Sequence, residues 1–448
     1  MLQYKNLNVV KHNQIKGSTA AEIASSIERV LHAGPQASGQ LPTIRELAAT
    51  LRVSPVTVAA AYRLLQTRGL AVGHGRRGTR LRPQSVAHAH TARAASMADG
   101  VIDLATGNPD PDLLPPIDVA LRTVSAAPHL YGEPLELRPL IAFAAAEFEA
   151  DGVPSGAVTV TSGALDAVER VLREHLRPGD RVVVEDPALP ALLDLLGSLG
   201  LTPQPSAIDD NGVEPGAFER ALGPQVRAVI VTPRAQNPTG AAMTTRRAAD
   251  LSRALRRRPQ VVLIEIDPAG PVSGASAVTL VDPSREHWAV VKSTSKFLGP
   301  DLRVALMAGD ALTVARVQRR QALGVRWVSH LLQRLTLALW SDPSNGRRLA
   351  RAADVYAQRR SALSDALAAH GIAAHARSGF NVWIPVGEET ATVQSLAERG
   401  WAVAPGERFR IRSAPAIRVT TSALAPDEAR RFAADLAAVL ESRGSALA

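Results

Sequence analysis

The sequence predicts an α/β protein in two parts, a small basic helical module at the N-terminus and a large domain built on a mostly parallel β-sheet. The formal net charge of +9 lies entirely within residues 1–84, and the rest of the chain has equal numbers of basic and acidic residues. Beyond residue 100, short β-branched runs alternate with helical stretches, as in parallel sheets. These runs are Val158–Thr161, Arg181–Glu185, Ala228–Thr232, Val261–Ile266 and Ala289–Val291.

Length and composition exclude several classes of protein. A chain of 448 residues is too long for one ordinary core and predicts two or three domains. It contains no run of eighteen apolar residues, and its N-terminus lacks the apolar region of a signal peptide. Cysteine is absent, so disulfides and thiolate metal sites are excluded, and the histidines show no metal-binding spacing. We therefore expect a cytoplasmic protein with no membrane segment and no metal.

The basic module, residues 17–84, has the pattern of a helix-turn-helix. A first helix is predicted over Thr19–Leu31 from its apolar spacing. Thr43 precedes the second helix and has Glu46 three residues later, which is the spacing of a capping box. Ser54 then caps a third helix that begins with a proline. Two short helices followed by a longer one are typical of a DNA-binding helix-turn-helix.

The segment after the third helix, Gly69–Pro83, predicts two short strands around a glycine- and arginine-rich tip. With the helices before it, the segment resembles the GntR-type winged helix, which implies double-stranded operator DNA as partner. The resemblance places eight residues on the DNA face: Arg45, Ser54, Pro55, Thr57, His74, Gly75, Arg76 and Arg77. Because the third helix is poor in arginine, it is expected to recognise few bases or to contact them mostly through apolar side chains. The alternative is a basic domain that binds a protein. Residues 85–100 are predicted to be a linker.

Lys296 is the candidate nucleophile of the large domain, residues 101–444. Only two of the five lysines, Lys292 and Lys296, lie beyond residue 16, although the chain has forty-six arginines. Lysine can act as an amine nucleophile, whereas arginine stays protonated. Lys296 follows a predicted strand and a hydroxyl-rich turn, and Arg303 comes seven residues later. Hydroxyls, an amine and a guanidinium in this order would suit a ligand that carries an aldehyde beside a phosphate. The alternative is an ordinary surface lysine after a core strand.

The segment S-x-S-K followed by G-P-D-L-R, together with the loop N-P-T-G, resembles the fold-type-I aminotransferases. This resemblance implies a large domain of the PLP-dependent transferase type with a small C-terminal α+β lobe. It also implies pyridoxal 5′-phosphate (PLP) as cofactor, held by Lys296 as a Schiff base, and Arg418 as a clamp for a substrate carboxylate. The other implied cofactor contacts are Tyr131, Ala164, Leu165, Asn237, Asp267, Ser293, Ser295 and Arg303, with Tyr131 acting across a subunit interface.

Three positions depart from the aminotransferase pattern. Leu189 replaces the aromatic residue that usually stacks on the cofactor ring, and Ile266 replaces the aspartate that usually meets the ring nitrogen. Pro268 stands where tyrosine or histidine is usual. Asp267 would reach the ring only if the strand end were irregular, because side chains alternate along a strand. Without a carboxylate at the ring nitrogen, proton removal from a bound amino acid is expected to be slow.

A winged helix joined to an aminotransferase-like domain resembles the MocR subfamily of GntR-type regulators. The resemblance implies a head-to-tail homodimer with PLP, an amine or an amino acid as effector, and genes of vitamin B6 or amino-acid metabolism as targets. Binding of effector and DNA would then be reciprocally coupled. The departures at the ring favour a regulator over an enzyme. The alternatives are a working aminotransferase, and a regulator that has lost PLP and senses another ligand.

Overall fold

The computed structural model describes residues 15–32, 40–67, 70–73, 78–81, 100–154 and 156–444. The chain divides into two compact units, with the main boundary after residue 98, and each unit is described by itself. The predicted linker at 85–100 lies outside the described residues except for Gly100. Within the described part of the chain, no helix combines the length and the apolar character needed to cross a membrane.

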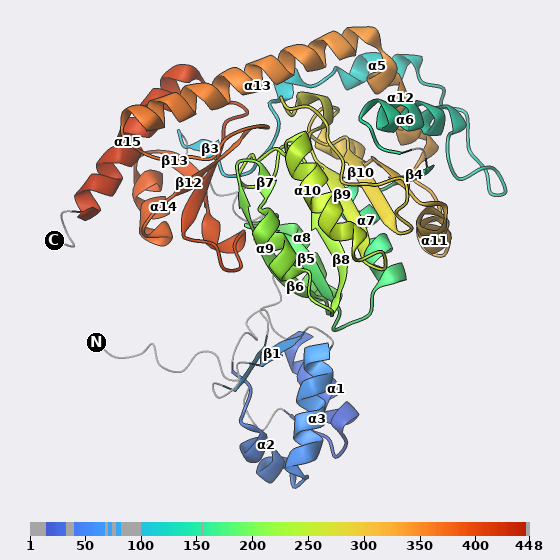
Figure 1. Ribbon diagram of the computed structural model, residues 1–448, viewed down its shortest axis with the longest axis vertical. Helices are drawn as coiled ribbons and strands as arrows, with labels where there is room; N and C mark the ends of the chain where they lie inside the picture. The colour runs from blue at the N-terminus through green and yellow to red at the C-terminus, as the bar shows by residue number, and fades with distance from the viewer. Residues whose placement is uncertain are drawn as a thin grey trace. The chain divides into compact units, whose positions relative to one another are not determined.

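The N-terminal unit is a three-helix domain with a β-hairpin (Figure 1). Its elements are α1 (Ala20–His32), α2 (Ile44–Leu51), α3 (Pro55–Thr67), β1 (Ala71–Gly73) and β2 (Thr79–Leu81). The predicted capping box is confirmed, since the Thr43 hydroxyl accepts from the Glu46 amide and the Glu46 carboxylate accepts from the Thr43 amide. The helices close over a core of buried side chains that includes Ile23, Ile27, Leu47, Val58, Tyr62 and Leu65.

The two wing strands pair in antiparallel register, with Ala71 opposite Leu81 and Gly73 opposite Thr79. The predicted strands of the wing are therefore confirmed. The tip residues His74, Gly75, Arg76 and Arg77 lie outside the described residues.

The large unit is built on an eight-stranded sheet of order β4-β11-β10-β9-β8-β5-β6-β7. Strands β8, β9 and β10 run parallel, and β11 is antiparallel to both β10 and β4. The predicted mostly parallel sheet is thus confirmed, with β11 antiparallel to both its neighbours and β7 antiparallel to β6. The strands are β4 (Ala157–Thr161), β5 (Arg181–Asp186), β6 (Thr202–Asp209), β7 (Gly212–Val213), β8 (Val226–Val231), β9 (Val262–Asp267), β10 (Trp288–Ser293) and β11 (Ala305–Gly309).

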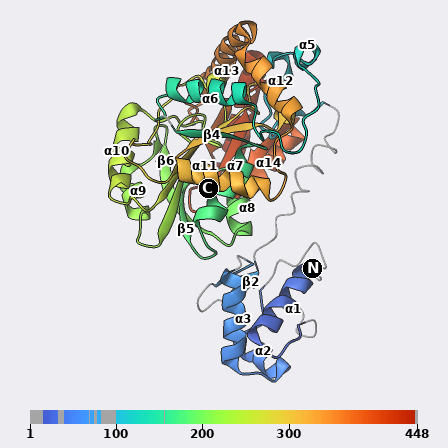
Figure 2. The ribbon, with the colours of Figure 1, turned by 90° about the vertical axis from the view of Figure 1, so that its right-hand side faces the viewer.

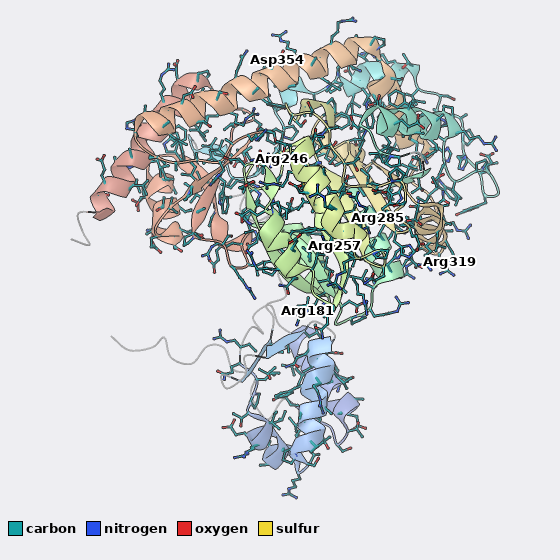
Figure 3. All side chains as sticks on the ribbon, in the orientation of Figure 1. Arg181, Arg246, Arg257, Arg285, Arg319 and Asp354 are labelled. Carbon is teal, nitrogen blue, oxygen red and sulfur yellow. The ribbon has the colours of Figure 1, made fainter. Side chains whose placement is uncertain are left out.

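Helices surround this sheet (Figure 2). They are α5 (Ile117–Thr123), α6 (Arg138–Ala150), α7 (Ala164–His175), α8 (Pro190–Ser198), α9 (Pro215–Ala221), α10 (Thr245–Arg256), α11 (Ala311–Ala322) and α12 (His330–Ser341). Arg285, labelled in Figure 3, is buried and donates to the carbonyl oxygens of Leu255 and Val261, each at 2.7 Å. These bonds tie the end of α10, where the Leu255 carbonyl also accepts from the Arg258 amide, to the residue before β9, and they fix the approach of the chain to β9.

The C-terminal lobe has a second sheet of order β12-β14-β13-β3. Its elements are β3 (Ile102–Leu104), α13 (Pro343–Ala369), β12 (Asn381–Pro385), α14 (Glu389–Glu398), β13 (Trp401–Pro405), β14 (Ala416–Thr420) and α15 (Pro426–Gly444). Helices α13 and α15 pack against each other, and the long α13 is drawn in orange in Figure 1. Short 3₁₀ helices lie at Pro111–Leu113, Gly270–Val272, Pro300–Leu302 and Gly406–Arg408.

Candidate functional site

Lys296 lies three residues beyond the end of β10, in the turn that leads toward β11. Its amine donates a hydrogen bond to the carbonyl oxygen of Gly107 at 2.6 Å and lies 5.7 Å from the centre of the Phe380 ring. Burial, assisted by the positive charge of Arg418, lowers the pKa of the Lys296 amine to about 8. A larger fraction of the amine is therefore unprotonated near neutral pH, as nucleophilic attack on a carbonyl requires.

Arg418, on β14, is 5% exposed and lies beside this amine. One of its Nη atoms donates to the Asn237 side-chain oxygen at 3.2 Å, and the other donates to the carbonyl of Ala105. Its Nε is buried and has no hydrogen-bond partner, and burial lowers the pKa of the guanidinium to about 10. A buried cation with an unused donor is suited to an anionic ligand such as a carboxylate. The structure thus brings together the predicted Lys296, Asn237 and Arg418.

A second group of predicted residues lies where β4, β11 and β10 meet. Because Thr161 pairs with Ala305 and Ser293 also pairs with Ala305, the residues next to these positions are neighbours in space. Arg303 donates to the carbonyl of Ser162 at 3.3 Å, and Ser293 and Ser295 join their hydroxyls at 3.2 Å.

Helix α7 begins at Ala164, so Ala164 and Leu165 belong to its first turn, whose amide groups point toward the start of the helix. A β-carbon on Gly163 would lie 2.7 Å from the Arg303 guanidinium. A glycine is therefore required for this close approach. Hydroxyls, helix amides and a guanidinium in one place are suited to a phosphate.

Tyr131 does not lie in this group. Its side chain is 79% exposed, its ring meets the Trp327 ring edge-on at 5.5 Å, and the Arg326 guanidinium lies 5.1 Å from its centre. Leu130 and Leu323, which are also exposed, add further apolar surface in the segments beside it. The structure therefore leaves Tyr131 available for contact with another copy of the chain.

The predicted cofactor contact of Asp267 is wrong. Strand β9 stays regular to its end, with Ile266 and Asp267 paired to consecutive residues of β10. The Asp267 carboxylate accepts from the Arg234 guanidinium at 2.6 Å and from the Gly270 amide at 2.9 Å. It lines a small cavity with Glu265 rather than facing the Lys296 amine. Side chains alternate along a strand, so Ile266 points to the opposite side from both carboxylates.

The predicted DNA-contacting residues that the structure describes gather at the start of α3 and in α2. The side chains of Arg45, Ser54 and Pro55 are exposed, and that of Thr57 is half-buried. The Ser54 hydroxyl accepts from the Thr57 amide at 3.1 Å and shares a hydrogen bond of 2.8 Å with the Thr57 hydroxyl. The predicted cap of the third helix is therefore confirmed, and this exposed helix start is what a winged helix presents to a DNA groove.

Two family models cover the chain. Aminotransferase class I and II matches residues 99–436, and the bacterial regulatory proteins of the gntR family match residues 19–81. The chain belongs to the MocR-type GntR regulators. It is 42% identical over 429 residues to the vitamin B6 salvage pathway transcriptional repressor PtsJ of Salmonella typhimurium, which covers 94% of this chain and 98% of that protein.

The MocR-type regulator also matches the HTH-type transcriptional regulator YdcR of Escherichia coli, with 26% identity over 89% of this chain and 92% of that protein. Among solved structures, the kynurenine aminotransferase of Pyrococcus horikoshii superposes with a TM-score of 0.72 at 21% identity, over 80% of this chain and 95% of that chain. At this identity the likeness shows the fold alone. The chain is thus a DNA-binding transcriptional regulator with an aminotransferase-like domain, a fold that typically binds PLP.

Some functional groups of this regulator were not found from sequence. The carbonyls of Ala105 and Gly107 hold Arg418 and Lys296, and the Phe409 ring lies 5.0 Å from the Arg418 guanidinium. Backbone carbonyls leave no trace in residue type. In the sequence, Gly107 begins the segment G-N-P-D-P.

Proposed function

We propose that this MocR-type regulator senses PLP, or PLP together with an amine or amino acid, and controls genes of vitamin B6 or amino-acid metabolism. The observation that supports the proposal is the half-buried Lys296, whose amine has a pKa lowered to about 8 and lies beside Arg418. The identity of 42% to PtsJ along nearly the whole chain supports the choice of target genes.

The residues present fit the phosphate and the side groups of PLP. Arg303, the start of α7 and the Ser293–Ser295 pair would hold the phosphate, and Asn237 would face the ring hydroxyl. The unused Nε of Arg418 would meet the carboxylate of an amino acid. When bound, PLP supplies an aldehyde that condenses with amines and a ring that withdraws electrons. The chain's part is to lower the pKa of the Lys296 amine, so that it loses its proton more readily, and to position the two anionic groups.

The same pocket is poorly equipped for turnover. Ile266 offers no charge to a ring nitrogen, and the Asp267 carboxylate is paired with Arg234. Leu189, half-buried, offers a smaller and non-aromatic surface for stacking. The pocket would still capture PLP, but it would stabilise a carbanion on the bound amino acid only weakly. This combination supports a sensing role over transamination.

The exposed apolar surface supports a homodimer. Leu130 and Tyr131 are adjacent in the chain and are 62% and 79% exposed, and Leu323 is 77% exposed. Contiguous exposed apolar surface is typical of protein interfaces. In the proposed head-to-tail dimer, Tyr131 would reach the phosphate of the partner's pocket. Effector binding would then change the relative placement of the DNA-binding modules, and DNA would in turn alter effector affinity by the same factor.

The test of sensing is a titration of the purified full-length protein with PLP. A visible absorption band that borohydride fixes on Lys296, and that is missing in Lys296→Ala and Lys296→Arg, is expected. Arginine keeps the length and charge of the side chain but cannot form the bond. Absence of a band in the wild type would favour a regulator of another ligand. Multiple turnovers of an amino acid with an α-keto acid would instead establish an aminotransferase.

The test of DNA binding is a mobility shift with DNA fragments selected by the wild-type protein. Arg45→Ala is expected to weaken binding and to reduce its salt dependence, because it removes a phosphate contact. Arg122→Ala is the matched control, since Arg122 is also exposed and pairs only with Asp118 one helical turn away. Equal affinity of the two variants and the wild type would contradict the proposed DNA face.

A further inference from the structure

The first two turns of helix α3 present an exposed side that is unusually apolar for a surface that faces DNA, before Arg63 on the same side. Val56 is 71% exposed, and Ala59 and Ala60 are half-buried at the positions one turn further along. The opposite side of the helix is buried in the core of the module through Val58, Ala61, Tyr62 and Leu65. Residues three and four apart lie on the same side of a helix, so Val56, Ala59 and Ala60 form one apolar stripe.

The hydrogen-bonding groups of the same helix start are largely occupied. The Ser54 hydroxyl accepts from the Thr57 amide, and the two hydroxyls bond to each other at 2.8 Å. Pro55, the first residue of the helix, has no amide hydrogen to donate. Base edges that present only hydrogen-bond donors and acceptors would therefore find few hydrogen-bonding partners at the first turn of α3.

Exposed basic side chains lie on and just after α2, the helix that packs against α3. Arg45 on α2 and Arg52 just after it are both exposed, and residues 1–84 hold the whole formal charge of +9. Basic groups around an apolar strip favour a duplex, whose phosphates would meet the arginines, over a neutral protein surface. In the major groove, the one apolar group that a base presents is the 5-methyl of thymine.

We infer that Val56 is a specificity-determining residue that contacts a thymine 5-methyl group in the major groove, with Ala59 and Ala60 leaving room for the methyl to approach. The regulator thus reads thymine in each half-site by apolar contact. This inference rests on DNA binding by the winged helix. It adds to that function the class of base edge that is recognised and the residue that recognises it.

The experiment uses the full-length protein and a duplex enriched by it from a random library. Each thymine of the best duplex is replaced in turn by deoxyuridine, which lacks only the methyl. A buried methyl is worth about fourfold in affinity. One thymine in each half-site is expected to give about a fourfold weaker dissociation constant when replaced, whereas replacement outside the half-sites changes nothing.

The double-mutant cycle assigns the contact. In Val56→Ala, replacing those thymines by deoxyuridine is expected to leave the affinity unchanged, because the valine side chain that contacts the thymine methyl has been removed. The change leaves the helix stable, since alanine is the best helix former. Val119→Ala, at a valine of α5 that is 55% exposed, is the matched control and should keep the fourfold loss.

Three results would overturn the inference. If no thymine shows a loss in a wild-type protein that binds its duplex tightly, apolar reading of the methyl is refuted while DNA binding stands. If the loss persists in Val56→Ala, another residue reads the methyl. Failure of the wild type to enrich any duplex would refute the DNA-binding function itself, and the inference with it.

Discussion

The pH dependence of ligand capture follows from the environment of Lys296. Burial and the Arg418 charge lower the pKa of its amine from the ordinary 10.5 to about 8. At pH 7, roughly one amine in ten is then unprotonated, which is about 300 times the fraction for an ordinary lysine. The amine attacks an aldehyde only in its unprotonated form. Capture should therefore speed up about tenfold per pH unit below pH 8 and level off above it.

The assay follows the visible absorption of PLP mixed with the protein between about pH 6 and pH 10. Nα-acetyl-lysine serves as the reference amine, so that ionisation of the aldehyde itself cancels in the ratio of the two rates. The unprotonated fraction of the reference amine keeps rising with pH until its own, higher pKa. The ratio of the protein's rate to the reference rate should therefore be constant below pH 8 and fall above it. A ratio that stays constant up to pH 10 would refute the lowered pKa.

Arg418→Gln tests the electrostatic part of the reasoning. Loss of the guanidinium charge should raise the pKa of Lys296, so the break in the profile should move to higher pH. Arg303→Gln is the control. Arg303 belongs to the residues proposed to hold the phosphate, where it donates to the Ser162 carbonyl, and it is not among the causes of the lowered Lys296 pKa. In Arg303→Gln, PLP should bind more weakly, but the pH at which the capture rate levels off should not change. The same break in Arg418→Gln as in the wild type would contradict the assigned cause.

Three further outcomes are expected. Gly163→Ala should weaken PLP binding by roughly tenfold in absorption titrations, because its φ of +114° and the Arg303 guanidinium at 2.7 Å both oppose a side chain. Ile266→Asp should speed exchange of the α-proton of a bound amino acid by roughly tenfold or more, measured by deuterium uptake, since it returns a carboxylate to the ring position. Thr43→Ala should lower the stability of α2 by about 1 kcal/mol, measured by hydrogen exchange in the full chain, because the capping box is lost.

The elements that sequence predicted best are governed by local rules. The capping box of Thr43 and Glu46, the Ser54 cap and the proline at the start of α3 each depend on residues within one turn of helix. Such spacings have the same physical consequence in any fold, so they could be interpreted before the tertiary structure was known. The same holds for the turn that presents Lys296 after a buried strand.

The pocket itself depends on contacts between distant parts of the chain. Lys296 meets the carbonyl of Gly107 across 189 positions of sequence, and Arg418 meets Asn237 across 181. Neither pairing has a spacing that sequence could reveal, and only the resemblance to a family placed these residues together. Asp267 shows the reverse case. Strand alternation alone directs it away from the ring, and the nearest carboxylate in sequence was wrongly assigned to the site.

The two lysines of the large domain differ in the charges that surround their amines. The Lys292 amine pairs with the Asp151 carboxylate at 2.9 Å and is buried, so its positive charge stabilises the packing. The Lys296 amine donates to a neutral carbonyl and faces the cation of Arg418, so its positive charge is disfavoured. A sensor requires capture of a ligand and a difference in affinity between two states, but no turnover. Rapid proton removal would convert the captured ligand and shorten the signal. The lowered pKa of the Lys296 amine would favour capture of a ligand, and the apolar Ile266 in place of the ring-nitrogen carboxylate would limit turnover, as the proposed sensor requires.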